Sequence, residues 1–350
     1  MLRYLSLIAL SASCALLAPA AVAAECAGSE VVERTTYQMG TLLRVRVEAA
    51  DRACGLAAID MVLVEVTRLE RVLSSWTTAS EIGAVNAASP GATVMVTREL
   101  AGLLAEAGVW VEGTGGAFDP AVGALVDVWA LRGAGRLPTA TELAAARAAT
   151  GWRHLRLDRA GRTVTRGPAG WWLDTGAFGK GVALRAAASV LRSHGVRRAV
   201  VDFGGQLLVL GEAEVSVSHP AQRDVVVARV SAREASVATS SASERFVEAA
   251  GRRMGHVVDP RTGEPVAAWG SVTVLSGDAL EADALATALF VMGRAAALAW
   301  AAAREVGVLV LWQDGGRVHA EWNEAMNVFV LEAPTRERSK MNTNGKENRE

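Results

Sequence analysis

The amino-acid sequence predicts an α+β fold in which mixed sheets pack with helices. Segments with strand periodicity and segments with helical periodicity follow each other along the chain without a regular repeat. This irregular order argues against a doubly wound parallel sheet, in which strands and helices alternate strictly. The 350 residues, of which 51% are hydrophobic and 21% charged, can bury one large core or two smaller ones. That composition excludes a disordered or fibrous protein.

The first half of the chain combines one clear strand with several helices. Residues 41–48 alternate the apolar Leu43, Val45 and Val47 with charged residues, which is typical of a half-buried strand. Helical patterns and two short strand patterns follow. The helices are predicted over 57–73, 97–111 and 141–149, and the strands over 154–157 and 163–166.

The second half of the chain contains most of the predicted strands. A helix over 180–194 leaves a glycine-rich turn, and a second helix over 282–292 is preceded by acidic residues, which a helix N-terminus favours. A pair of strands over 199–210 is interrupted by Gly204-Gly205. Further strands are predicted over 225–230 and 271–275, and a hairpin joins 306–312 to 317–322.

Residues 1–24 have the three regions of a secretory signal peptide. Arg3 precedes an apolar run over 5–17, and small residues fill 18–24. Pro19 ends the apolar helix just before the cleavage region, which favours a cleaved signal over a membrane anchor. We therefore expect an exported, periplasmic protein.

This interpretation divides the chain into three segments: the signal peptide, one folded domain over 25–334, and a polar tail over 335–350 that is expected to be disordered. Cys14 follows Ser11-Ala12-Ser13, which lacks the leading aliphatic residue of a lipoprotein cleavage box. Lipid anchoring is therefore disfavoured. Beyond the signal, no apolar run reaches the ~20 residues that span a bilayer.

Cysteine count and charge limit the possible partners. After cleavage only Cys26 and Cys54 remain, and an oxidising compartment would allow one disulfide between them, although the sequence does not fix their distance in space. No cysteine spacing suggests a metal site. The formal net charge of −1 gives no general attraction to nucleic acid or anionic lipid, so no nucleic-acid partner is expected.

The most informative motif runs from Asp174 to Gly181 and enters a predicted helix. Glycines allow a backbone to approach a ligand closely, and a helix N-terminus offers free N–H groups to an anion such as phosphate. Lys180 stands in this motif, and only three of the 36 basic residues are lysines. The Walker spacing is absent, so an ordinary tight connection remains the alternative.

A second motif places Asp283 and Thr287 four residues apart in a predicted helix. Residues at that spacing share a face, so a carboxylate and a hydroxyl can converge on one hard cation such as Mg²⁺. The alternative is that Asp283 serves the helix N-terminus and Thr287 packs in the core.

A third motif, over 255–263, joins His256 to a turn built by Asp259, Pro260 and Gly263. Histidine titrates near neutral pH, which makes His256 a candidate general base. Structural turns explain the Asp, Pro and Gly residues equally well.

Two aromatic residues stand beside small polar residues. Trp76 follows Ser74-Ser75, and Phe118 lies in Gly116-Ala117-Phe118-Asp119-Pro120. Both rings are able to flank a flat ring system, although an aromatic residue beside a loop more often packs in the core.

Taken together and in this order, these segments resemble the FAD:protein FMN transferases, the ApbE-like flavin transferase family. The resemblance extends from residue 39 to about residue 290. The matching pieces are Met39-Gly40-Thr41, Ser75-Trp76 with Ser80-Glu81-Ile82 and Asn86, Phe118-Asp119-Pro120, Asp174 through Gly181, Gly204-Gly205, Thr239-Ser240, His256 through Gly263, and Asp283 through Thr287.

The resemblance implies an ApbE-like fold and a Mg²⁺-dependent enzyme that passes FMN from FAD to a Ser or Thr hydroxyl of an acceptor protein, while AMP leaves. The acceptor would be a membrane-associated or exported redox protein. His256 would deprotonate the acceptor hydroxyl. The metal would be bound by Asp283, Thr287 and the backbone carbonyl of Ala177. The FAD site would be lined by Met39, Trp76, Ala117, Phe118, Asp119, Asp174 and Lys180.

Two other functions remain open at this point. A Mg²⁺-dependent FAD pyrophosphatase would use the same site, with water in place of the protein hydroxyl. A non-catalytic FAD-binding protein is the other alternative, although the combination of Asp283, Thr287 and His256 argues against it.

Overall fold

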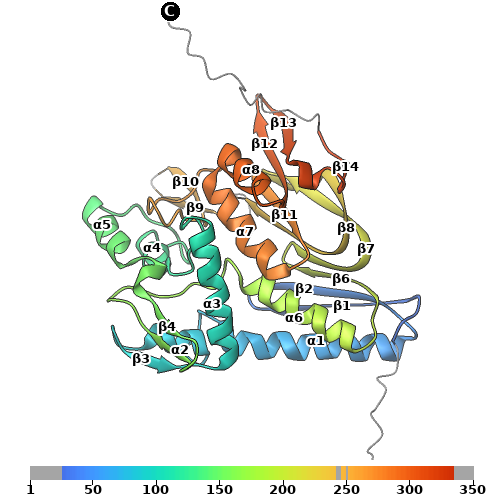
Figure 1. Cartoon of the computed structure of the whole chain (residues 1–350). Helices are drawn as coiled ribbons and strands as arrows, with labels where there is room; N and C mark the ends of the chain where they lie inside the picture. Colours follow the sequence, from blue (N-terminus) through green and yellow to red (C-terminus); the bar gives the residue numbers. More distant parts are fainter. Residues whose placement is uncertain (1–25, 242–245, 250, 335–350) are drawn as a thin grey trace, which may run out of the picture.

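The computed structural model describes residues 26–241, 246–249 and 251–334 (Figure 1). These residues form antiparallel sheets that are covered by helices, so the predicted α+β class is confirmed. The predicted signal peptide over 1–24 and the predicted tail over 335–350 lie outside the described residues.

One large sheet forms the frame of the molecule. Within the described residues it has nine strands in the order β1-β2-β6-β7-β8-β11-β12-β13, and β14 also pairs with β8. Every pairing recorded for these strands is antiparallel. The strands are β1 (Glu30–Gln38), β2 (Thr41–Ala49), β6 (Arg198–Phe203), β7 (Gln206–His219), β8 (Gln222–Ser241), β11 (Ser271–Ser276), β12 (Gly307–Asp314), β13 (Arg317–Trp322) and β14 (Val330–Glu332).

Four helices pack on or beside this sheet: α1 (Arg52–Leu73), α6 (Gly179–Ser193), α7 (Ala279–Met292) and α8 (Arg294–Ala302). The buried residues of α1 recur every three or four positions, as expected for a helix with one face on a core. In α7 the burial extends around the helix, because it contacts β8 and β11 as well as α6 and α8. A charged residue inside α7, Asp283, is therefore buried among apolar neighbours.

A smaller region lies beside the large sheet (Figure 1). It contains a three-stranded sheet in the order β3-β5-β4 and the hairpin of β9 and β10. The strands are β3 (Thr93–Met95), β4 (Arg156–Asp158), β5 (Thr163–Thr165), β9 (Phe246–Ala249) and β10 (Arg252–Gly255). The helices are α2 (Glu81–Ala87), α3 (Arg98–Gly113), α4 (Gly123–Val128) and α5 (Ala140–Ala149). The described residues also contain the 3₁₀ turns η1 (Trp152–His154) and, between β13 and β14, η2 (Glu324–Met326).

The predicted elements are present, with three kinds of difference. Helix α1 begins at Arg52, five residues before the predicted start, because the Asp51 side chain caps it by accepting the Cys54 N–H at 2.8 Å. Strand β8 extends over 20 residues, where only 225–230 was predicted, because β7 and β11 pair along it and bury its small polar residues. Elements such as β1, α2, α4 and α8 were not predicted from the sequence.

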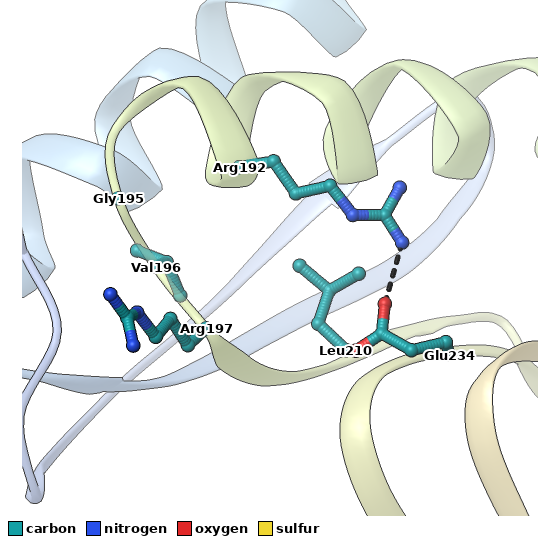
Figure 2. Close-up of a pocket in the computed structure, with 6 residues that line it drawn as sticks. All are labelled: Arg192, Gly195, Val196, Arg197, Leu210 and Glu234. Carbon is teal, nitrogen blue, oxygen red and sulfur yellow. Dashed lines mark hydrogen bonds and ion pairs between the residues drawn. The ribbon is translucent and has the colours of Figure 1, made fainter.

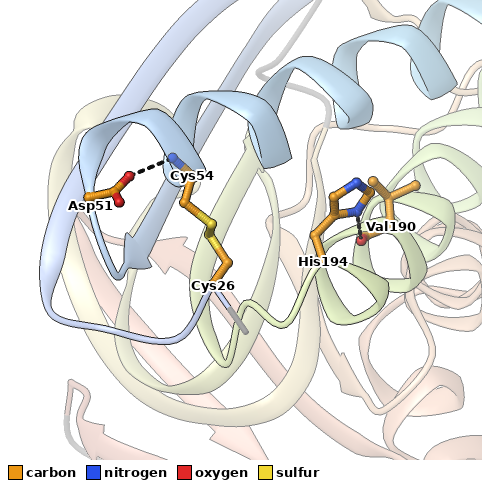
Figure 3. Close-up of a disulfide and its surroundings, with 5 residues drawn as sticks. All are labelled: Cys26, Asp51, Cys54, Val190 and His194. Carbon is orange, nitrogen blue, oxygen red and sulfur yellow. Dashed lines mark hydrogen bonds between the residues drawn. A yellow bond between two sulfur atoms is a disulfide. The ribbon is translucent and has the colours of Figure 1, made fainter. Parts of the chain in front are cut away.

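Cys26 and Cys54 form a disulfide, with their Cα atoms 5.9 Å apart (Figure 3). This bond links the segment before β1 to the first turn of α1, so the pairing that the sequence left open is made. Among the described helices, none combines the length and apolar character that crossing a membrane requires.

Candidate active site

The predicted glycine-rich motif forms the turn that begins α6. The Thr175 carbonyl accepts the N–H groups of Phe178 (3.2 Å) and Gly179 (2.7 Å), which closes the turn. The Thr175 hydroxyl donates to the Leu73 carbonyl at the end of α1, at 2.8 Å. The Asp174 N–H donates to the Pro120 carbonyl at 2.7 Å. The turn therefore lies where the end of α1 and the predicted Phe118–Pro120 segment meet.

Gly181 lets α6 approach α7 closely. A Cβ atom at this position would lie 2.5 Å from the Ala279 carbonyl oxygen and 2.7 Å from the Leu280 Cα, closer than real side-chain atoms come to a backbone. Any side chain here would push the two helix starts apart. The glycine thereby brings Lys180 and Asp283 together, although they are 103 residues apart in sequence.

Asp283 is 5% exposed, and both of its carboxylate oxygens face the start of α6. Oδ2 accepts the Gly181 N–H at 2.8 Å, and Oδ1 lies 3.3 Å from the Lys180 Nζ. The start of α7 itself is capped by Asp278, which accepts the Glu281 N–H at 3.0 Å. One interpretation predicted that Asp283 serves the N-terminus of its own helix. In the structure it serves the N-terminus of α6 instead. A negative charge is favourable there.

Thr287 and Ala177 are the other two residues predicted to bind the metal. Thr287 lies one helical turn after Asp283 on α7, and its Oγ1 is 3.5 Å from the Ser240 Oγ on β8. Ala177 lies half-buried in the glycine-rich turn. We call Lys180, Gly181, Asp283 and Thr287 the helix-start cluster. Within the described residues, no three His, Cys, Asp or Glu side chains gather as a metal site.

Met39 also reaches this place. Its Cε lies 3.6 Å from where a Cβ of Gly179 would stand, so the side chain covers the start of α6. Met39 occupies the turn between β1 and β2. The structure therefore brings Met39, Lys180 and Asp283 to one end of α6.

A second group of side chains gathers around Asp174, at the start of the glycine-rich turn. The Arg132 guanidinium lies 3.1 Å from the Asp174 carboxylate, and its Cζ is 4.1 Å from the centre of the Trp76 ring and 4.4 Å from that of Trp172. Asp174 and Trp76 were predicted as FAD-site residues, whereas Arg132 and Trp172 were not. We call Trp76, Arg132, Trp172 and Asp174 the aromatic wall.

The two predicted aromatic residues differ in exposure. The Trp76 side chain is 70% exposed, whereas Phe118 is 1% exposed and packs edge-to-face on Phe178, with ring centres 6.3 Å apart. Phe118 therefore follows the core interpretation of its motif, and Trp76 presents its ring at the surface. Ala117 is buried beside Phe118.

Asp119 holds its own segment together. Its two carboxylate oxygens accept the N–H groups of Ala121 and Trp152, each at 2.8 Å. Burial raises the pKa of this carboxyl above its usual value, although the two backbone hydrogen bonds oppose the shift. These contacts shape the loop that meets Asp174.

His256 lies on a separate segment, directly after β10. The following residues form a hairpin that is closed by a Val258–Pro265 bridge and by a hydrogen bond from the Gly263 N–H to the Asp259 carbonyl at 2.8 Å. The Asp259 carboxylate binds Arg261 at 2.8 Å, and this hydrogen bond raises the pKa of the guanidinium. The Asp, Pro and Gly residues thus build a turn, while the half-buried His256 precedes it.

The described part of the chain contains hollows, of which two have a volume of about 390 Å³ each. The first lies at the C-terminal end of α6 (Figure 2), and the 15 residues of α6 place it roughly 20 Å from the glycine-rich turn. Arg192 and Glu234 in its lining form an ion pair at 2.7 Å. The second is lined by Ala144, Arg147, Ala148, Arg153, Pro260 and Arg261. Neither hollow includes a predicted site residue.

Comparison with known proteins decides the family. The ApbE family model matches residues 39–312. The chain belongs to the ApbE family. A FAD:protein FMN transferase of Treponema pallidum (strain Nichols) is 37% identical over 285 residues, which cover 74% of this chain and 78% of the relative. One of Rhodobacter capsulatus is 34% identical over 272 residues, 75% of this chain, which spans about half (51%) of that relative.

Solved structures of ApbE proteins have the same fold. The crystal structure of the ApbE protein from Thermotoga maritima superposes with a TM-score of 0.78 at 28% identity, covering 86% of this chain and 99% of that one. The apo form of the Pseudomonas stutzeri flavinyl transferase ApbE gives a TM-score of 0.75 at 25% identity, covering 85% and 96%. The predicted resemblance, the ApbE-like α+β fold and the transferase class are thereby confirmed.

Sequence reasoning did not find Arg132 and Trp172, which contact the predicted residues Trp76 and Asp174. Trp172 lies two residues before the glycine-rich motif, so its position was a usable signal. Arg132 lies between α4 and α5, and no periodicity or turn motif marks it. Its role depends on contacts with residues 40 to 57 positions away, which local patterns do not record.

Proposed function

We propose that this chain transfers FMN from FAD to a Ser or Thr hydroxyl of an acceptor protein and releases AMP, in a Mg²⁺-dependent reaction. The observation that carries this proposal is the contact between the glycine-rich turn and Asp283. It places a buried carboxylate, a lysine and a helix N-terminus beside one another in a chain whose relatives are FAD:protein FMN transferases.

Two residues of the helix-start cluster, together with Ala177 in the glycine-rich turn, fit a magnesium ion. Asp283, Thr287 and the Ala177 carbonyl are all oxygen donors, which Mg²⁺ prefers, and one carboxylate suits an ion that keeps several waters and binds substrate phosphates. These three residues would hold the ion. When bound, it would neutralise charge on the pyrophosphate and on the departing AMP.

Lys180 and the start of α6 would bind the phosphates themselves. The Lys180 ammonium is half-buried and already lies against one carboxylate oxygen, at 3.3 Å, so its charge is held at the helix start. A lysine and helix N–H groups that point at a pyrophosphate stabilise the negative charge that develops as the phosphoryl group is transferred. Met39 would cover this end of α6 and limit the access of water.

His256 would act as the general base. The acceptor oxygen would attack the phosphorus of the FMN half, and its proton would pass to the His256 imidazole. The bond from that phosphorus to the bridging oxygen would break, and AMP would leave with the bridging oxygen. The hairpin closed by Val258 and Pro265 would give His256 a defined position on the backbone.

The aromatic wall would bind a flat ring of FAD. Most of the Trp76 side chain is exposed, and the Arg132 guanidinium packs on its indole ring. Asp174 and the loop over Ala117, Phe118 and Asp119 would support this part of the site from the protein side. Stacking on an indole suits both the isoalloxazine and the adenine ring.

We also propose that the protein is exported and acts in the periplasm on an exported or membrane-associated redox protein. The Cys26–Cys54 disulfide supports export, because such bonds persist in oxidising compartments. The predicted signal peptide directly precedes Cys26.

The proposal is tested with the mature protein, FAD and Mg²⁺, with and without an acceptor domain, by measuring AMP release and covalent flavin on the acceptor. Transfer predicts AMP and flavinylated acceptor in equal amounts. AMP and free FMN formed at the same rate without acceptor would indicate the pyrophosphatase instead. FAD binding without AMP release would indicate a non-catalytic protein.

A further inference from the structure

Arg132 contacts two indole rings, and we call these three side chains the Arg132 stack. The guanidinium Cζ lies over the rings of Trp76 and Trp172, 4.1 Å and 4.4 Å from the two ring centres. Both distances are within the range of a favourable cation–π contact. A planar guanidinium can stack on two rings at once, which the compact ammonium of lysine cannot do.

Hydrogen bonds and an ion pair fix the position of the same guanidinium. Nη1 donates to the Ser75 carbonyl at 3.0 Å, and Nη2 donates to the Ser75 hydroxyl at 2.7 Å. Nη2 also lies 3.1 Å from the Asp174 carboxylate. The other Asp174 oxygen accepts the Gly176 N–H at 2.9 Å. Arg132 therefore connects the residue before Trp76 to the glycine-rich turn.

Trp172 provides a rigid support for this stack. Its indole N–H donates to the Asp127 carboxylate on α4 at 2.7 Å. Its ring packs on Gly123, where a Cβ would overlap the indole. Trp172 is thus held by α4, and Arg132 links Trp172 to Trp76.

Trp76 has little support of its own. The side chain is 70% exposed, and within the described residues its indole N–H makes no hydrogen bond. An exposed side chain that becomes ordered on binding loses rotamer entropy, which lowers affinity. The contact with Arg132 holds the indole, and most of the Trp76 surface remains accessible to a ligand.

We propose that Arg132 is a positioning residue for the flat-ring subsite: it holds Trp76 in a stacking orientation before FAD binds and links that orientation to Asp174 in the glycine-rich turn. The inference rests on the proposed function, because it names FAD as the ligand. The chemistry that it addresses is a flat heteroaromatic ring, and FAD contains two, the flavin and the adenine.

The test compares Arg132→Ala and Arg132→Lys with the parental protein. Equilibrium Kd values for FAD, FMN and AMP are measured without acceptor, with flavin fluorescence quenching as the signature of stacking on an indole. Melting temperatures, and KM and kcat for FAD in the transfer assay, are measured on the same preparations. Arg304→Ala is the matched control, because Arg304 lies over Trp300 at 4.3 Å, at the end of α8.

Arg132→Ala is expected to raise the Kd and KM for FAD about tenfold and to reduce flavin quenching, with kcat changed less than about twofold. Arg132→Lys, which keeps the charge without the planar fork, should weaken binding about threefold. Arg304→Ala should leave Kd unchanged. The loss should be shared by FMN if the flavin stacks on Trp76, and by AMP if the adenine does.

Two results would overturn the inference. One is a folded Arg132→Ala protein whose Kd for FAD, FMN and AMP and whose quenching equal those of the parental protein. The other is an equal weakening by Arg304→Ala, which would indicate a general loss of stability. The proposed function fails separately: a parental protein that binds FAD but modifies no acceptor would refute the transferase proposal, while the Kd comparison would still decide the role of Arg132.

Discussion

The helix-start cluster and the aromatic wall include residues from the two ends of one turn but are built differently. The first is positioned by the backbones of α6 and α7, which pack so closely that only glycine fits at position 181. The second is positioned by side chains from three loops, with Arg132 as the shared partner. We infer that the cluster tolerates almost no change, whereas contacts of the wall can be weakened one at a time with graded effects. The predictions below test this difference.

Replacing Asp283 by Ala should have the largest effect and reduce FMN transfer to the background rate. The change removes the one carboxylate proposed for the metal, and a bound ion supplies several kcal/mol of charge stabilisation. It also leaves the Gly181 N–H without its side-chain acceptor. Asp283→Asn is the matched control for folding, because it keeps the volume and an acceptor oxygen. Transfer at the parental rate with the same Mg²⁺ dependence would exclude Asp283 as a metal ligand.

Replacing His256 by Ala should slow transfer by roughly 10²–10⁴-fold, the usual contribution of a positioned base. The Kd for FAD should remain nearly unchanged, because the histidine directly precedes the hairpin and belongs to neither group that would bind FAD. His256→Gln, which can hydrogen-bond but cannot act as a base, should be equally slow. If His256 instead serves only the turn, the variants will melt at lower temperature and still modify the acceptor normally.

Replacing Gly181 by Ala should destabilise the protein by about 1–3 kcal/mol through overpacking against α7. Transfer should fall with it, since Lys180 and Asp283 would be displaced together. Gly102→Ala is the control: it lies in α3 with no atom within 4 Å of the added Cβ, so a helix-stabilising gain of about 0.5–1 kcal/mol is expected. Urea unfolding of both variants provides the measurement. Equal stability of the two variants would contradict the close-packing argument.

The smallest effect concerns acid stability in α5, which packs beside the His256 hairpin. Glu142 accepts the Thr139 N–H in a capping box and also binds Arg136, and these contacts lower its pKa from 4.5 to about 2. A lowered carboxyl pKa stabilises the folded state above the unfolded value near 4.5, and this contribution is lost as the pH falls towards 2.

Glu142→Gln should therefore lower the melting temperature slightly at pH 6, and the difference from the parental protein should shrink steadily as the pH falls below about 4.5. Thermal melts between pH 6 and pH 3 give the comparison. A difference that stays constant over this range would show that the cap does not depend on the carboxylate charge.

The sequence alone determined the fold class, most helices and strands, and the order of the motifs that identify the ApbE family. These features are local. Apolar periodicity records which face of a helix or strand is buried, as in β2 and α1, and glycine records a backbone conformation or a close approach. The glycine-rich turn before α6 could therefore be located, and so could the Asp283–Thr287 spacing on α7, without knowing what either would contact.

Tertiary structure alone decided the partners. It pairs Asp283 with an N–H group 102 residues away, joins Cys26 to Cys54, and brings Arg132 over two tryptophan rings that are remote from it in sequence. It also extended β8 through small polar residues that have little apolar periodicity. Such contacts depend on how whole elements pack, and the free energy of that packing is summed over many residues. No short stretch of sequence determines this packing free energy. The contacts of the site therefore follow only from the tertiary structure, which brings the helices and loops together.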